Sequence, residues 1–560
     1  MLTFSNNPQT AEQQMQAVIF YLTTFGYIDG DFDRTEREFV LNYIHKLVTR
    51  RVETGMPDAD EKLRVELTQK FTTHFREEFD RIDRRILDLF TEAVAKDENQ
   101  HAFVQTKLKT RCFEIFQSFD TEGQEALMET VDELLMADGV AHPAELKFRA
   151  ELQALLEDDL GIELDKESVR PPVKVKPPTS MSARDITHPF FDQFEHHYSS
   201  DLPVLMKQID GDLGIMSKTM QMFDKQRQAG SGKLKGKTKI SELAKEDPFL
   251  DGHVYVVPSK PGQTYDITVL GDLHGCYSCL KAAIMQSRFF DKVNAFKKDP
   301  VNNPEPKLVF LGDYIDRGLY SLNGVLRTVM QIANTAPDHV YMLRGNHEYY
   351  IEHEGQVFGG VVPADAINNL KPHVETDVFK HYIEFFEKMP NMLILGETLF
   401  VHGGIPRDLL LKEKYVDLSS LNDPEIRFQM MWSDPSSVDV IPVQLQQQSS
   451  RFPFGRLQAT AFLQRIGCTS MVRGHEKINE GFVKTYDDEN LLLITLFSAG
   501  GATNDDLPQN SGYRKVTPMG MSMTVKDKTI DVTPWKIDYS AYNDPKYNNF
   551  FKATPPIKPI

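Results

Sequence analysis

The stretch LVFLGDYIDRG at residues 308–318 predicts the fold and the chemistry of the larger part of this 560-residue chain. Its first four residues form a short apolar run, and a turn rich in glycine, aspartate and arginine follows. A buried strand that ends in such a turn delivers polar side chains to the rim of an α/β sheet, where ligands bind. We therefore expect this turn to belong to a functional site.

Four other apolar runs lead into polar clusters of the same kind. They are ITVLGDLHG (267–275), VYMLRGNHE (340–348), LFVHGG (399–404) and SMVRGHE (470–476). Glycines beside the polar residues let the backbone turn sharply and approach an ion or a phosphate closely. Aspartate, asparagine and histidine without cysteine suit manganese, iron or zinc. One bridging carboxylate with ligands on either side suits a pair of ions about 3.5–4 Å apart.

The five blocks, in this order, resemble the signature of the phosphoprotein phosphatase family, the PPP-type metallophosphoesterases. Ile315 replaces the usual valine, and the resemblance covers about half of the chain. Five ordered blocks are far more specific than any single motif. The resemblance implies an α/β fold, a metallophosphatase β-sandwich flanked by helices, and here an all-α N-terminal domain precedes it.

The resemblance also implies a ligand set for two divalent ions, for which we expect manganese, with iron or zinc as alternatives. The first ion would be held by Asp272, His274 and Asp313. The second would share Asp313 and add Asn346, His402 and His475. By the same resemblance, a hydroxide that bridges the two ions attacks phosphorus directly, without a phosphoenzyme.

The remaining site residues follow from the same motifs. His347 occupies the general-acid position, and Asp316 would orient its imidazolium. The phosphate-binding arginines would be Arg317, Arg344 and Arg451, because a guanidinium matches phosphate geometry in a two-pronged way. Arg451 lies in a shortened loop after Trp432-Ser433-Asp434-Pro435.

We expect a protein serine/threonine phosphatase that acts on phosphoproteins. Cys276 after GDLHG resembles bacterial members of the family, including diadenosine tetraphosphate hydrolases, so hydrolysis of nucleotide polyphosphates is the alternative. A sensing or binding protein with low turnover is a third hypothesis. Cys276 and Cys279 could form a redox pair, but two small packing residues beneath the first metal loop are the favoured interpretation.

The domain organisation is predicted from composition. Residues 1–160 have helical periodicity and weakly resemble TerB-like domains, through Asp29-Gly30 and Asp138-Gly139 with a glutamate at the same offset. We expect this domain to be regulatory or partner-binding, and the repeat alone suggests the hypothesis that its acidic pairs bind a cation weakly. The other predicted segments are a proline-rich linker with one helix and a flexible connector (161–255), the catalytic domain (256–535) and an extended tail (536–560).

Bulk properties limit the partners and the location. The net charge of −18 argues against a broad nucleic-acid-binding surface. Four cysteines indicate a reducing compartment, and no window approaches the roughly 20 apolar residues that span a bilayer. We therefore expect a cytoplasmic protein that binds neither nucleic acid nor membrane.

Overall fold

The computed structural model divides the chain into two compact units. It describes residues 5–557 apart from positions 6, 29–31, 91, 93, 136–142, 157–161, 163, 165–169 and 528. The smaller unit, here the helical unit, comprises Met1–Gly161 and Ser436–Pro453. The larger, here the sheet unit, comprises Ile162–Pro435 and Phe454–Ile560.

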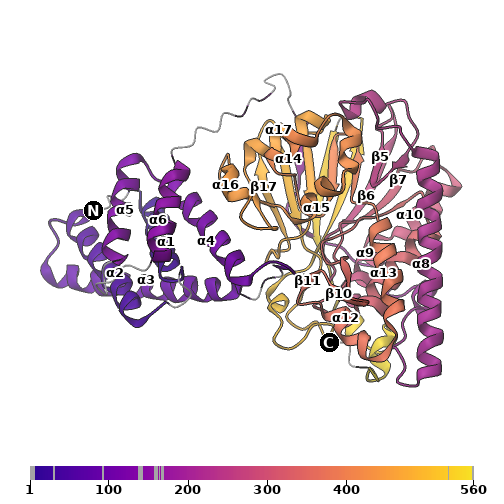
Figure 1. The fold of residues 1–560 in the computed structure, drawn as a ribbon, viewed down its shortest axis with the longest axis horizontal. Coiled ribbons are helices and arrows are strands. Elements are labelled where there is room, and N and C mark those ends of the chain that lie inside the picture. The colour runs from indigo at the N-terminus through magenta and orange to yellow at the C-terminus, as the bar shows by residue number, and fades with distance from the viewer. Residues whose placement is uncertain are drawn as a thin grey trace. The chain divides into compact units, whose positions relative to one another are not determined.

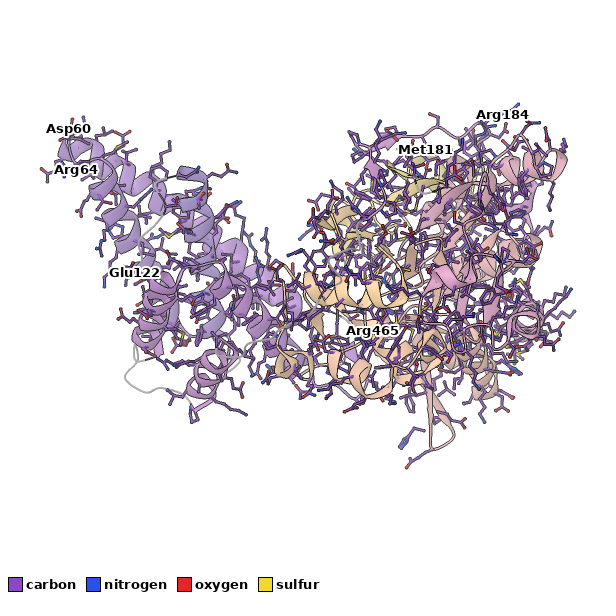
Figure 2. All side chains as sticks on the ribbon, turned by 90° about the horizontal axis from the view of Figure 1, so that it is seen from above. Asp60, Arg64, Glu122, Met181, Arg184 and Arg465 are labelled. Atoms are coloured by element: carbon purple, nitrogen blue, oxygen red, sulfur yellow. The ribbon has the colours of Figure 1, made fainter. Side chains whose placement is uncertain are left out.

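Amphipathic helices pack around one apolar core in the helical unit (Figure 1). They are α1 (Pro8–Gly26), α2 (Arg34–Gly55), α3 (Glu61–Leu89), α4 (Gln100–Gln117), α5 (Thr121–Leu135) and α6 (Pro143–Leu156). At the start of α3, Asp60 accepts the Leu63 N–H at 2.8 Å, and Arg64 donates to the carbonyl of Ala59 at 2.9 Å (Figure 2). Such caps satisfy donors that the first helical turn leaves open. Asp29 and Asp138 lie outside the described residues, and the TerB-like resemblance stays a prediction.

The segment Ser436–Pro453 belongs to the helical unit although its neighbours in sequence belong to the sheet unit. Ile441 and Leu445, the latter in the short helix α16 (Val443–Gln446), are fully buried in the core of the helical unit. Ser436 and the Ser437 N–H both donate to the Glu114 carboxylate. The predicted catalytic domain, 256–535, included this segment. The structure instead places the segment in the helical unit, because its apolar side chains complete the helical core.

Two seven-stranded sheets form the centre of the sheet unit, as far as its residues are described (Figure 1). The first sheet has the order β17 (Phe482–Asp487), β18 (Leu492–Leu496), β16 (Ser470–Arg473), β13 (Thr398–Val401), β12 (Met392–Leu395), β5 (Val254–Val257), β4 (Phe249–Asp251). The second has the order β2 (Val173–Val175), β20 (Thr529–Lys536), β19 (Met519–Lys526), β6 (Thr264–Leu270), β7 (Glu305–Phe310), β8 (Val340–Met342), and β3 (Thr179–Ser180) pairs with β20. The α/β class expected from the sequence is confirmed.

Alternate side chains of a strand in the first sheet pack into two different apolar cores, one on each face of that sheet. In β12, Leu393 and Leu395 join the core that includes side chains of the second sheet, whereas Met392 and Ile394 join a separate outer core. Successive side chains of a strand point to opposite faces, so both faces of this sheet are covered. The outer core contains residues of the helices α14 (Asp408–Lys414), α15 (Pro424–Trp432) and α17 (Arg456–Ile466).

Parts of the predicted linker and tail belong to the folded sheet unit. The long helix α8 (Leu202–Gly230) buries Ile209, Met216 and Phe223 in the main core and packs beside α11 (Arg327–Thr335) and α13 (Thr376–Lys388) (Figure 1). Near the C-terminus, Tyr542 and Phe550 are buried in the same core. These segments are therefore folded, unlike the predicted linker and extended tail, because their apolar side chains pack against residues far away in sequence.

Among the described residues, no helix is both long enough and apolar enough to span a bilayer.

Candidate metal centre

The polar clusters predicted from the sequence follow the ends of parallel strands. β6, β7 and β8 run parallel in one sheet, and β13 and β16 run parallel in the other. An isolated bridge between Asp272 and Phe497 joins the two sheets at this end. Because each cluster follows the carboxyl end of its strand, the five clusters reach one common rim.

The six predicted metal ligands form one connected, buried cluster. His274 Nε2 lies 3.8 Å from Asp272 Oδ2 and 3.4 Å from Asp313 Oδ2. His402 Nε2 lies 3.4 Å from Asp313 Oδ1. Asn346 Oδ1 lies 2.9 Å from His402 Nε2 and 3.0 Å from His475 Nδ1. Asp313 thus presents Oδ2 toward His274 and Oδ1 toward His402, which suits a carboxylate that bridges two ions.

The donor set fits two cations. The ligand atoms of Asp313, His402 and His475 lie within 4.8 Å of one another, and Asp313 also belongs to a second such group with His274 and His347. Asp272 Oδ2 is buried and accepts no hydrogen bond. A buried carboxylate oxygen without a donor is costly, so its place beside His274 suits a bound cation.

The backbone is strained where it delivers these side chains. His274, Asp313 and His475 have positive φ angles of 42°, 54° and 70°. Such angles are uncommon for residues other than glycine and cluster at functional sites. A Cβ at Gly345 would stand 2.2 Å from Asp313 Oδ1, and one at Gly474 would stand 2.2 Å from Asp272 Oδ1. Only glycine fits at these two positions.

Burial and neighbouring charges shift the pKa values of the ligands. Burial raises the pKa of Asp272 to about 7, and it lowers the pKa of His274 to about 3. Burial also opposes ionisation of Asp313, but His402 and His347 more than offset it and hold its pKa well below the ordinary value. Neutral His274 and ionised Asp313 are the forms that bind a metal ion.

His347 is held in the geometry of a proton donor. Its Nδ1 lies 2.6 Å from Asp316 Oδ2, its backbone N–H donates to Asp313 Oδ1 at 3.0 Å, and its Nε2 lies 4.0 Å from Asp313 Oδ2. Burial lowers the pKa of His347, but the carboxylates of Asp313 and Asp316 outweigh it, so the pKa is raised. These two carboxylates therefore favour the protonated form of the His347 imidazole.

The three predicted phosphate-binding arginines have different surroundings. Arg317 Nη1 lies 3.6 Å from Asp365 Oδ2, and the Arg317 side chain is 16% exposed. Arg344 is buried and donates to the carbonyl of Glu348 at 2.9 Å and to Glu387 at 2.8 Å. Arg451 belongs to the helical unit, where its guanidinium lies 3.5 Å from the carboxylate of Glu92. The phosphate-binding roles of Arg317, Arg344 and Arg451 all stay predictions.

Two buried residues that support the cluster have roles that sequence reasoning missed. Glu348 accepts the N–H groups of Asp313, Tyr314 and Gly345 at 2.8, 2.8 and 2.9 Å, which ties two ligand loops together. Arg473 donates to Asp434 at 2.9 Å and to Glu476 at 2.6 Å. Both residues stood inside quoted motifs, but three of their partners, Asp313, Tyr314 and Asp434, lie in other segments.

Backbone carbonyls orient two of the histidine ligands. His274 Nδ1 lies 2.9 Å from the Ile315 carbonyl, and His402 Nδ1 lies 3.1 Å from the Leu311 carbonyl. A bond at Nδ1 leaves Nε2 as the metal-binding nitrogen.

Cys276 and Cys279 are both fully buried. Burial raises the pKa of the Cys276 thiol well above its ordinary value, which supports the packing interpretation over a reactive redox pair.

Comparison with known proteins gives one family model and several curated relatives. Residues 265–478 match the model of the calcineurin-like phosphoesterases. The chain is 29% identical over 237 residues to the serine/threonine-protein phosphatase 6 catalytic subunit of Caenorhabditis elegans, which covers 42% of this chain and 64% of that one. It is 26% identical over 297 residues to human serine/threonine-protein phosphatase 5, and the match covers 51% of this chain and 52% of that one. A probable serine/threonine-protein phosphatase of Encephalitozoon cuniculi is 24% identical over 273 residues, covering 48% and 53%. The chain thus spans about half to two thirds of the length of these relatives.

Proposed function

We propose that this chain is a metal-dependent protein serine/threonine phosphatase, because residues 265–478 match the model of the calcineurin-like phosphoesterases and the relatives named above are serine/threonine-protein phosphatases. The observation that carries the proposal is the buried cluster of the six proposed metal ligands, with His347 held by Asp316 beside it. The relatives named above are protein phosphatases, which favours a phosphoprotein substrate over nucleotide polyphosphates.

Metallophosphoesterases of this family use a dinuclear metal centre. Here Asp272, His274 and Asp313 would hold one divalent ion, and Asp313, Asn346, His402 and His475 would hold the other. We propose manganese, with iron or zinc as alternatives, because aspartate, asparagine and histidine suit ions of intermediate hardness. Bound ions of this kind lower the pKa of a coordinated water and stabilise negative charge on phosphoryl oxygens.

The protein side chains then bind the phosphate and move the proton. The Arg317 guanidinium is the predicted arginine that lies on the same turn as Asp316, so it is placed to bind a phosphate oxygen. The Nε2 proton of His347 goes to the leaving alkoxide of serine or threonine. Asp316 keeps the imidazole oriented and charged until that transfer.

We also propose that the helical unit is regulatory or binds a protein partner. The polypeptide leaves the sheet unit after Pro435, contributes Ile441 and Leu445 to the helical core, and returns at Phe454. The neighbouring Asp434 accepts a hydrogen bond from Arg473, close to the ligand His475. Ser436–Pro453 is therefore the segment of the helical unit whose chain continues directly from Asp434 and Pro435.

A cytoplasmic location is part of the proposal. All four cysteines are buried free thiols, which suits a reducing compartment.

The test is a side-by-side assay of the full chain loaded with Mn²⁺. A phosphoserine peptide, p-nitrophenyl phosphate and diadenosine tetraphosphate are compared by kcat/KM, with Asp313→Asn as the inactive control. We expect the peptide to be hydrolysed with the higher kcat/KM of the two biological substrates. A higher kcat/KM for diadenosine tetraphosphate would favour the nucleotide alternative. Fully loaded protein that hydrolyses none of the three, judged by phosphate or nitrophenol release and, for diadenosine tetraphosphate, by the formation of mononucleotides, would favour a sensing protein.

A further inference from the structure

The short helix α12 (Asp365–Leu370) begins against the turn that carries Asp316 and Arg317. The Arg317 N–H donates to Asp365 Oδ2 at 3.2 Å, and Arg317 Nη1 lies 3.6 Å from the same oxygen. One residue on, the Ala366 N–H donates to Asp316 Oδ1 at 2.7 Å. The start of α12 thus holds both residues of the turn.

This turn needs external support. Asp316 and Arg317 are consecutive residues with positive φ angles of 67° and 68°. Two neighbouring non-glycine residues in this conformation persist only when surrounding contacts hold them. Within the turn itself, the Gly318 N–H donates to the Asp316 carbonyl at 2.8 Å. The contacts from Asp365 and Ala366 hold the turn from outside.

The two residues of the turn act on the same substrate group. Asp316 uses one carboxylate oxygen for His347 and the other for the Ala366 N–H. The separation of 3.6 Å between the Arg317 guanidinium and Asp365 is longer than a hydrogen bond, so this guanidinium can still bind phosphate. A movement of α12 would shift the acid-orienting carboxylate and the guanidinium together.

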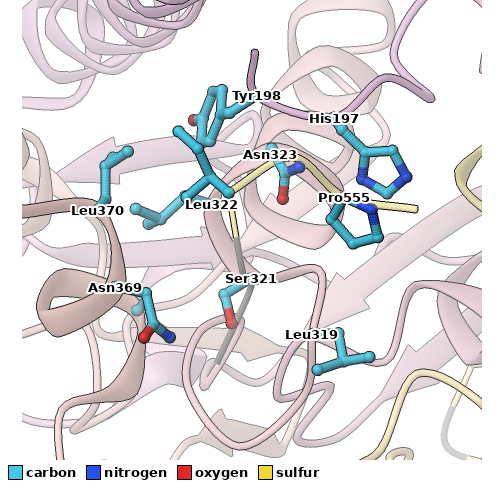
Figure 3. Close-up of a pocket in the computed structure, with 11 residues that line it drawn as sticks. His197, Tyr198, Leu319, Ser321, Leu322, Asn323, Asn369, Leu370 and Pro555 are labelled. Carbon is cyan, nitrogen blue, oxygen red and sulfur yellow. The ribbon is translucent and has the colours of Figure 1, made fainter. Parts of the chain in front are cut away.

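A cavity borders α12 (Figure 3). Leu319 and Ser321, which follow the turn, line it together with Ala366, Asn369 and Leu370 of α12. Because the cavity interrupts the packing around α12, the hydrogen bonds of Asp365 and Ala366 are what join this helix to the turn at Asp316 and Arg317.

We propose that Asp365 is a positioning residue for substrate phosphate. Its carboxylate accepts the Arg317 backbone N–H at 3.2 Å and lies 3.6 Å from the Arg317 guanidinium, so it fixes the residue that would bind the phosphate. This inference rests on the proposed phosphatase function. It can still be tested separately, because the affinity for inorganic phosphate is measured without any catalytic turnover. A carboxylate that merely competed with phosphate for Arg317 would have the opposite effect on that affinity.

The experiment is a double-mutant cycle on the full, Mn²⁺-loaded chain with Asp365→Ala, Arg317→Ala and the double variant. Calorimetry measures the Kd of inorganic phosphate, and steady-state kinetics measures KM and kcat for a phosphoserine peptide. We expect Asp365→Ala to raise the phosphate Kd and KM by about 5–20-fold in the natural background and by less than about twofold when Arg317 is already alanine. Asp365→Asn should give a smaller loss, because its amide oxygen can still accept the Arg317 N–H.

Asp377→Ala is the matched control, because Asp377 is an exposed aspartate paired with Lys380 on α13, and it should leave both constants unchanged. Asp365→Ala protein that binds phosphate as tightly as the natural chain, or more tightly, overturns the proposal. So does an equal loss in both backgrounds. If Asp365→Ala does not fold, the same cycle with Asp365→Asn replaces it. Absent peptide hydrolysis by the natural chain would contradict the phosphatase function, while the phosphate cycle would still decide the role of Asp365.

Discussion

Replacing Leu445 by alanine tests whether the segment Ser436–Pro453 is part of the helical core. Leu445 is fully buried there, and α16 packs against α4. The change removes three buried carbon atoms, which costs about 2.4 kcal/mol at about 0.8 kcal/mol each, and the remaining cavity extends the range to about 5 kcal/mol. For a unit of about 150–250 residues, this loss lowers the Tm by roughly 4–20 °C.

The assay is calorimetry of the full chain combined with hydrogen exchange. We expect the transition of the helical unit to move to lower temperature, and the amides of α4 to exchange faster in Leu445→Ala. The amides of β6 and β7 should keep their protection, because these strands lie in the other unit.

Leu409→Ala is the matched control, since Leu409 is 39% exposed and its loss should move the Tm by much less. The reasoning would be refuted if α4 exchange were unchanged and the Tm of the helical transition stayed within about 1 °C of that of the natural chain. Loss of a fully buried leucine side chain should lower the free energy of unfolding by more than such a small shift allows.

The metal centre gives three further predictions. His347→Ala should lower kcat by about 10²–10⁴-fold with the metal content retained, and near-normal turnover would remove His347 from the mechanism. Asp313→Asn should lose both ions and the activity, which elemental analysis checks, and a full metal content would contradict its bridging role. Asp316→Asn removes a charge that raises the pKa of His347. A general acid is lost as pH rises through its pKa, so the alkaline limb of the kcat/KM profile should move to lower pH, and an unmoved limb would assign it to another group.

The sequence alone predicted that the six proposed ligands lie together, and their metal binding stays a prediction. The six ligands from Asp272 to His475 gather as expected, because each follows a strand whose apolar run and closing glycine are local in sequence. Parallel strands of an α/β sheet place the residues that follow them at one rim, so the ligands can be recognised from the short segments that carry them. The pairing of His347 with Asp316 followed from the same motifs.

Only the tertiary structure decided how the remaining segments are used. β2 pairs with β20, and β5 with β12, across more than a hundred residues of chain, so the predicted linker became part of both sheets. The segment around Leu445 joined the helical core, and Arg344 found Glu387 as its partner. Burial and ion pairing depend on which surfaces meet after folding, whereas a strand and the turn that ends it are specified by the residues they contain.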